Sequence, residues 1–261
     1  MIGSAVVYSG FVVAFIGLIL LVKPIRRLGF RTRRQASVVL IVGILIVASG
    51  FLLPAHESRI ARETSWLDQF MPIWQFDEFH SIQIAAPPER VYAAVKSVRA
   101  DEIVLFNTLT WIRRFGRPVP ESILNAGSRK SLLDVATQGG FIWLADDTPR
   151  ELVIGTLIAA PRGARPSLNP ATFLNPLPAG YTIAAMNFAV RADGAGGSLV
   201  STETRVYASR TPARRTFAAY WRVIYPGSAM IRRMWLRAIQ RRAMARVSAT
   251  GAIPVSLSAR D

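Results

Sequence analysis

The segment 199–209 alternates polar and β-branched residues with a period of two, which predicts a β-strand with two distinct faces. One face carries chemically active side chains: Ser201, Glu203, Arg205 and Tyr207. The other face is mostly β-branched: Val200, Thr202, Thr204 and Val206. If the first face lines a cavity, its carboxylate and guanidinium could orient a ligand headgroup or transfer protons. If it faces solvent, they form an ordinary ion pair. The second face is a credible core face, so we favour the structural interpretation.

Three further residues are candidate ligand contacts. Asn187 falls inside another predicted strand, and Tyr207 shares the polar face of 199–209. Trp235 belongs to an apolar stripe with spacings of three and four, typical of a helix packed on a sheet: Ile231, Met234, Trp235, Ala238 and Ile239. Burial of such side chains contributes about 1.5–3 kcal/mol each, so a core role explains the stripe without a cofactor.

The composition excludes several kinds of chemistry. The 261 residues include no cysteine and only two histidines, His56 and His80, which we interpret as structural. The signature loops of nucleotide, zinc and calcium sites and of serine hydrolases are missing from the sequence. We therefore expect no metal and no cofactor, and assign no catalytic residue.

The net charge of +16 is concentrated in two blocks. Residues 23–34 hold six positive charges and no negative one, and residues 204–261 have a net charge of +11. Between them, residues 56–203 have a net charge of −1. Each block therefore needs its own explanation.

The C-terminal block includes Arg233, Arg237 and Arg241, which recur every four residues on one helical face. Like charges at this spacing repel one another, so a negative partner is expected. Anionic lipid headgroups, acidic side chains of the same domain and nucleic acid are the alternatives. Nucleic acid is the least favoured, because no aromatic residues alternate with the arginines as base stacking would need.

Two uncharged segments near the N-terminus, 2–22 and 36–55, are each long enough to span the hydrocarbon core of a bilayer. Buried core helices and a cleaved signal sequence are less favoured alternatives. The connector 23–34 is short and basic, and such loops stay on the cytoplasmic side. We expect a two-span anchor over 1–55 in a bacterial cytoplasmic membrane, with the globular part outside the cytoplasm.

Small residues recur every seven positions in both segments, which allows close packing of two helices, although glycine is also common in membrane helices. The positions are Gly3, Gly10, Gly17, Ala36, Gly43 and Gly50. Residues 56–78 follow as an expected interfacial neck, with Trp66 and Trp74 at the headgroups. Packing of these aromatic residues into the globular domain is the alternative.

From residue 79 to 246 the pattern predicts an α+β domain. Strands are expected at 79–86, 141–145, 151–160, 181–191 and 199–209, and helices at 89–98, 101–115 and 212–246, the last with a possible break at Pro226-Gly227. Residues 247–261 are expected to form a flexible tail.

This order of elements, with the stretches 140–155, 201–206 and 217–235 and the pair Asn187-Phe188, resembles bacterial proteins of the SRPBCC superfamily. These START-like, helix-grip proteins include polyketide cyclases and lipid carriers. The resemblance implies a curved antiparallel sheet around a long C-terminal helix, with a deep apolar cavity between them. It implies no shared catalytic motif, and the membrane hairpin lies outside it.

The sequence thus favours a membrane-anchored protein that binds a hydrophobic or amphiphilic, lipid-like ligand in an internal cavity. Membrane lipid and a hydrophobic small molecule are the expected partners, and the oligomeric state stays open. A cyclase, dehydratase or hydrolase acting on a hydrophobic substrate is one alternative. A membrane-associated assembly protein whose cavity is filled by its own side chains is another.

Overall fold

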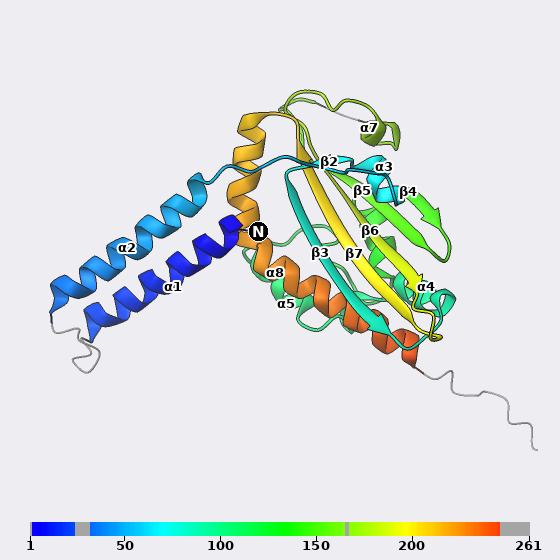
Figure 1. Cartoon of the computed structure of the whole chain (residues 1–261), viewed down its shortest axis with the longest axis horizontal. Coiled ribbons are helices and arrows are strands. Elements are labelled where there is room, and N and C mark those ends of the chain that lie inside the picture. Colours follow the sequence, from blue (N-terminus) through cyan, green and yellow to red (C-terminus); the bar gives the residue numbers. More distant parts are fainter. Residues whose placement is uncertain (1, 24–31, 165–166, 246–261) are drawn as a thin grey trace, which may run out of the picture.

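A computed structural model describes residues 2–23, 32–164 and 167–245, so the expected tail at 247–261 lies outside the described residues. Two parts are visible in Figure 1: a pair of antiparallel helices, and an α+β domain built on one sheet. This is the architecture of a helix-grip fold with an added helical hairpin, as the sequence predicted.

The hairpin consists of α1 (Ile2–Val22) and α2 (Arg33–Leu52), both long and apolar enough to cross a membrane. A Cβ atom added to Gly10 would lie 2.6 Å from the backbone nitrogen of Val47, and one on Gly17 would lie 2.5 Å from that of Leu40. The two backbones therefore approach closely because the facing residues are small. Four of the seven-spaced glycines, Gly10, Gly17, Gly43 and Gly50, face the other helix of the hairpin, whereas Gly3 faces Arg222 of α8.

Helix α2 begins three residues earlier than expected because Thr32 caps it. The Thr32 hydroxyl accepts from the Gln35 backbone nitrogen, and the Gln35 side chain accepts from the Thr32 backbone, which is a capping box. The helix ends at Leu52, ahead of Pro54. Most of the basic connector, residues 24–31, lies outside the described residues.

Five antiparallel strands form the sheet in the order β3-β7-β6-β5-β4. Their bounds are β3 Phe76–Ile84, β4 Phe141–Asp147, β5 Glu151–Ala159, β6 Thr182–Ala192 and β7 Ser198–Ala208. The register shifts between Trp143 and Ala145 and again between Leu157 and Ala159. Such irregularities increase twist and bend a sheet, which helps this one to curve around a helix.

The shorter helices are α4 (Pro88–Ser97), η2 (Ala100–Glu102), α5 (Phe106–Arg113), α6 (Leu132–Gln138) and α7 (Ala171–Leu174). The single helix expected at 101–115 is split, because Leu105 adopts a left-handed conformation with φ of 60° between η2 and α5. The sequence analysis placed no element at α6 or α7. Ser131 caps α6 through the Asp134 backbone nitrogen.

Helix α8 (Thr211–Met244) runs without interruption, although Pro226 lies inside it. Figure 1 shows that α8 changes direction along its length, and Pro226 accounts for the bend because it lacks a backbone donor. The part after Pro226 packs on the concave face of the sheet, where Trp235, Ala238 and Ile239 are buried and Ile231 and Met234 are partly buried, as the apolar stripe predicted.

The expected interfacial neck, 56–78, packs on the domain instead. Its β1 (Ser58–Arg59) pairs with β2 (Ile73–Trp74), and α3 (Trp66–Phe70) lies on the convex face of the sheet. Leu67 and Phe70 are buried there against Val153 and Ile183. Burial of these apolar side chains stabilises attachment to the sheet, so 56–78 belongs to the globular domain.

Candidate functional site

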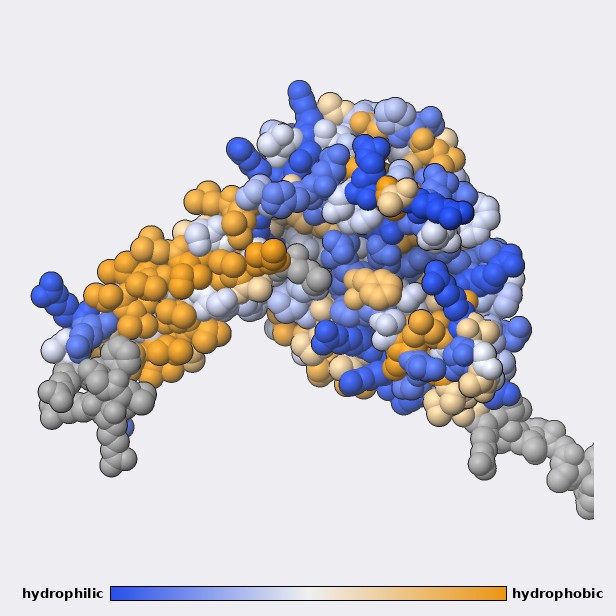
Figure 2. Space-filling model, in the orientation of Figure 1, coloured by the Kyte–Doolittle hydropathy of each residue, from blue (hydrophilic) through white to orange (hydrophobic). Residues whose placement is uncertain are grey.

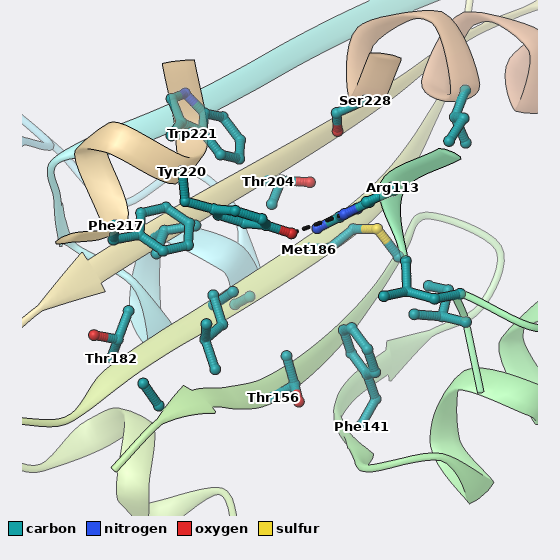
Figure 3. Close-up of a pocket in the computed structure, with 18 of the residues that line it drawn as sticks. Arg113, Phe141, Thr156, Thr182, Met186, Thr204, Phe217, Tyr220, Trp221 and Ser228 are labelled. Atoms are coloured by element: carbon teal, nitrogen blue, oxygen red, sulfur yellow. Dashed lines mark hydrogen bonds between the residues drawn. The ribbon is translucent and has the colours of Figure 1, made fainter. Parts of the chain in front are cut away.

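A cavity of about 690 Å³ lies between the concave face of the sheet, α5 and α8. Its wall is mainly apolar, and its largest members are aromatic: Phe106, Phe141, Phe217, Tyr220, Trp221 and Trp235. Figure 3 shows side chains from β5, β6, β7, α5 and α8 converging on this space. The volume lies within the range of about 300–1,000 Å³ found for small-molecule pockets. The cavity is therefore large enough for a ligand and is not filled by the chain's own side chains.

Arg232 of α8 is one of two cationic residues in the wall. Its Nη2 donates to the Thr204 hydroxyl at 2.8 Å, its Nη1 contacts the Met186 sulfur, and its guanidinium carbon lies 5.5 Å from the centre of the Trp235 ring. Burial lowers the pKa of Arg232 to about 10, so the side chain remains charged at pH 7. A cation thus stands in an apolar cavity with neutral partners.

The second cation is Arg113, at the end of α5. Its Nε donates to the Tyr220 hydroxyl at 2.8 Å, and the guanidinium carbon lies 5.5 Å from the centre of that ring. Figure 3 shows Arg113 pointing into the cavity toward Tyr220. The positive charge of Arg113 also contributes to the lowered pKa of Arg232, so the two guanidinium groups act on each other.

A carboxylate lies behind the wall, on β3. Glu78 is 2% exposed; its Oε2 accepts from the Ser228 hydroxyl at 2.7 Å, and its Oε1 lies 3.0 Å from His80 Nε2. Ser228 itself lines the cavity. The chain of contacts runs serine–glutamate–histidine, so the histidine does not contact the serine as it would in a serine hydrolase.

The polar face of β7 is turned away from this cavity. Arg205 forms ion pairs with Asp68 at 2.8 Å and with Glu203 at 2.6 Å, donates to the Met71 carbonyl at 3.0 Å and lies 4.0 Å from the centre of the Trp74 ring. These contacts attach α3 and β2 to the convex face. Glu203 and Arg205 therefore lie outside the cavity, in an ion-pair cluster in which Arg205 and Asp68 are buried beneath α3.

The charge of Asp68 is stabilised in this cluster. Burial raises its pKa, but hydrogen bonds from Thr64 and Arg205 outweigh that effect, and the pKa lies below its usual range. Tyr207 packs on the same convex side, against the cluster that contains Leu67.

Asn187 also belongs to the convex side. Its Nδ2 donates to Glu151 Oε1 at 2.6 Å, and its Oδ1 accepts from the Glu203 backbone nitrogen at 2.9 Å. Glu151 Oε2 accepts from the Trp66 backbone nitrogen at 2.8 Å, at the N-terminus of α3. Among the five candidate ligand contacts, the structure therefore places only Trp235 in the cavity wall.

The candidate membrane contacts are scattered. Trp66 is the first residue of α3 on the convex face, and its Nε1 lies 3.4 Å from Asp147 Oδ2. Helix α3 lies on the side of the domain away from α1 and α2 (Figure 1). Arg233, Arg237 and Arg241 are exposed on α8, and Arg241 donates to the Glu102 carbonyl. An acidic side chain does lie close to this face, because Arg242 forms a bidentate pair with Glu102 at 2.8 and 3.0 Å.

Another arginine joins the hairpin to the domain. Arg222 of α8 is 6% exposed and donates to the carbonyl of Phe51 at 2.9 Å and to that of Leu53, at the C-terminus of α2. The Tyr8 hydroxyl of α1 donates to the Val223 carbonyl at 2.7 Å. The free carbonyl groups at the end of a helix favour a cation, so this contact fixes α2 against α8.

Sequence reasoning missed Arg113, Arg222 and Arg232. The signal for Arg232 was present, because it lies four residues after Ser228 and three before Trp235, on the inner stripe of the helix. The sequence analysis used the neighbouring Arg233, which faces outward. Arg113 could not be placed, because its position depends on how α5 folds over the sheet.

In the parts of the chain that the structure describes, no group of three or more His, Asp or Glu side chains is arranged to hold a metal ion. The candidate site is therefore an apolar cavity with two cations, and the domain that encloses it has a helix-grip fold.

No family model and no curated protein matches the sequence. Among solved structures, the chain is similar to TTHA0849 from Thermus thermophilus, with 12% identity over 66% of this chain and all of that one, at a TM-score of 0.30. It is also similar to the Zhui aromatase/cyclase from Streptomyces sp. R1128, with 13% identity over 65% and 96% and a TM-score of 0.24. Human STARD10 follows with 9% identity over 63% of each chain and a TM-score of 0.19. Values this low carry no argument about ligand or activity.

Proposed function

We propose that the protein is anchored in a membrane by α1 and α2 and binds a hydrophobic or amphiphilic ligand in the cavity of its globular domain. The observation that carries the proposal is the apolar cavity of about 690 Å³, because apolar pockets with a few convergent polar groups are the usual form of a small-molecule site. The resemblance to the SRPBCC superfamily leads to the same expectation.

The surface of the hairpin supports the membrane anchor. In the most apolar 18-residue stretch of each helix, only 22% (α1) and 17% (α2) is buried. A core helix of a soluble domain is mostly buried. Large side chains such as Phe15, Ile41 and Leu45 are more than half exposed, and Figure 2 displays a continuous hydrophobic surface over these helices. An apolar surface this extended is stable in hydrocarbon and costly in water.

The proposed orientation places the globular domain outside the cytoplasm, because residues 23–34 carry six positive charges and basic loops are retained inside. A reporter enzyme fused after residue 261 tests this. Activity of a reporter that requires an extracytoplasmic location supports the orientation, and activity only of a cytoplasmic reporter contradicts it.

A photoreactive neutral lipid tests the ligand-binding function. We reconstitute the full chain in phosphatidylcholine nanodiscs with hexadecanol that carries a diazirine in its chain, irradiate, and map the labelled peptides. Labels are expected on the membrane-exposed face of the hairpin and on cavity-lining peptides around 182–186 and 228–235. Ala184→Trp places a large ring in the cavity and should remove only the cavity labels. Labelling confined to the hairpin contradicts the proposal.

The exposed Arg233 and Arg237 of α8 remain proposed contacts to anionic headgroups. Neither has a carboxylate ion-pair partner among the described residues, and each basic residue near a charged surface is worth about 1 kcal/mol. Hydrogen exchange of residues 227–244 should slow when phosphatidylglycerol is added to the nanodiscs. An unchanged rate contradicts this contact.

An enzymatic function is the second candidate, favoured by one observation: the Ser228 hydroxyl in the cavity wall donates to the buried Glu78 carboxylate. A carboxylate in that position could act as a base toward the hydroxyl or a bound substrate. Glu78→Gln should then abolish cleavage of a 4-nitrophenyl ester of a long-chain acid by the full chain. Absence of cleavage by the unmodified protein contradicts a hydrolase.

A further inference from the structure

The cavity wall contains two guanidinium groups, Arg113 and Arg232, and no carboxylate among its described members. A charged side chain inside an apolar cavity loses hydration, and burial is costly unless a partner of opposite charge replaces the water. The structure therefore has a cation site whose counter-charge is missing from the part of the wall that it describes.

The partners of Arg232 do not supply that counter-charge. Thr204 is a neutral hydroxyl and Met186 is a weak sulfur acceptor, so both leave the positive charge in place. No ion pair to a carboxylate is formed by Arg232 or Arg113 within the residues that the structure describes. Arg113 donates to the Tyr220 hydroxyl, again a neutral group.

Glu78 is close enough to influence Arg232 but does not neutralise it. Both carboxylate oxygens of Glu78 already have partners, since one accepts from Ser228 and the other contacts His80. Glu78 is also outside the lining of the cavity. Two cations therefore face the cavity and one anion lies behind its wall, which leaves an excess of positive charge where a ligand would lie.

We propose that the cavity takes an amphiphile with an acidic headgroup, a carboxylate or a phosphate, which Arg113 and Arg232 hold while its chain occupies the apolar wall. The forked donors of arginine suit both kinds of oxyanion. The inference rests on the proposed function, because it names the headgroup of the ligand in the same cavity. Thr204 stands beside Arg232, and its hydroxyl, which accepts from Arg232, can donate its own proton to the headgroup.

Competition against the photoreactive hexadecanol described above tests the headgroup. Hexadecanoic acid, hexadecyl phosphate and methyl hexadecanoate are each titrated over the same range of mole fractions in phosphatidylcholine nanodiscs that hold the full chain. We expect one or both acidic compounds to displace the cavity label at a concentration about ten- to hundredfold below that of the ester, the range of a charge-assisted hydrogen bond. The two acidic compounds separate a carboxylate ligand from a phosphate ligand.

Variants that each remove one positive charge test whether the preference for acid over ester arises in the cavity. Arg232→Gln and Arg113→Gln should each reduce the preference for the acid by about tenfold or more. Arg215→Gln is the matched control, because it removes the same charge from an exposed position on the same helix, outside the cavity lining. Arg113→Gln lies on a different element from Arg232, so it tests the inference even if Arg232→Gln does not fold.

The outcomes separate the two proposals. Displacement by acid and ester at equal concentrations, or an acid preference unchanged in Arg232→Gln and Arg113→Gln, overturns the acidic headgroup while the cavity label still supports ligand binding. Loss of preference in Arg215→Gln to the same degree as in the cavity variants also overturns it. Absence of any cavity label overturns the proposed function and this inference with it.

Discussion

The two halves of α8, before and after Pro226, each carry an arginine that faces the interior, Arg222 buried and Arg232 partly buried, and the two meet different environments. Arg222 donates to two carbonyl groups at the end of α2, whereas Arg232 projects into the cavity and contacts a hydroxyl and a thioether. The first site provides the partial negative charge that a cation needs, and the second does not. The comparison suggests that the first half attaches the membrane hairpin and the second half receives a ligand.

Arg205 on the convex face completes the comparison, because it forms ion pairs with two carboxylates, Asp68 and Glu203. Its replacement should therefore lower the free energy of unfolding more than the other substitutions. Arg205→Met leaves Asp68 buried at 4% exposure without its ion pair, which should cost about 3–5 kcal/mol. Urea unfolding of the full chain in nanodiscs, followed by tryptophan fluorescence, measures the free energy of unfolding. The control is Arg191→Met, an exposed arginine on the neighbouring strand; an equal loss in both would contradict the role of the pair.

Arg222→Met should come next, because it leaves the carbonyl groups of Phe51 and Leu53 without a donor. We expect a local loss of about 2–3 kcal/mol, the scale of a lost hydrogen bond to a charged group. Hydrogen exchange should accelerate at the end of α2 and in residues 211–225, with little change in the sheet. The control is Arg215→Met, at an exposed position on the same half of α8. Equal hydrogen-exchange rates in the two variants would contradict the role of Arg222 in attaching α2 to α8.

Arg232→Met should have a much smaller effect on the free energy of unfolding than Arg222→Met. Replacing an incompletely paired cation by an apolar side chain in an apolar wall should change the free energy of unfolding by less than about 1 kcal/mol, or increase it. The same urea titration measures this. A loss as large as that of Arg222→Met would mean that Arg232 is a structural residue.

The smallest effect is expected at the end of α8, where Arg242 pairs with the partly exposed Glu102. The hydrogen bond from Arg242 lowers the pKa of Glu102 below its usual value. Because the folded pKa is the lower one, the pair stabilises the fold above the unfolded pKa of about 4.3, and this contribution is lost as the pH falls through the folded value. Glu102→Gln should cost under about 1 kcal/mol at pH 7 and less at pH 3, as unfolding curves at the two pH values would reveal. An equal cost at both pH values would contradict the electrostatic origin.

Local patterns in the sequence were sufficient for most of the fold. Alternation along 199–209 and the spacing of Trp235 and Ile239 depend only on period, so β7 and the inner stripe of α8 could be predicted. The split at Leu105 could not, because a left-handed conformation at leucine is set by its tertiary surroundings. The sequence left the choice between an interfacial neck and packing on the domain open for the same reason, since Leu67 and Phe70 show their partners only once the convex face exists.

The site was less predictable than the fold. Period-two alternation divided β7 correctly into two faces, but the chemically active face, with Glu203 and Arg205, is the one that attaches α3. The cavity cations lie on a helix rich in arginine, and composition alone does not separate Arg232 from the exposed Arg233. Counting Arg232 with the inner stripe would have identified it.

The most direct test of ligand binding is native mass spectrometry of the full chain released from membranes, compared with Ala184→Trp. The account predicts that the unmodified protein retains one small apolar or amphiphilic molecule per chain and that the variant, whose cavity is occupied by the indole ring, does not. A folded, unmodified protein that carries no such molecule, or an equal load on both proteins, would contradict the claim that the cavity is the binding site.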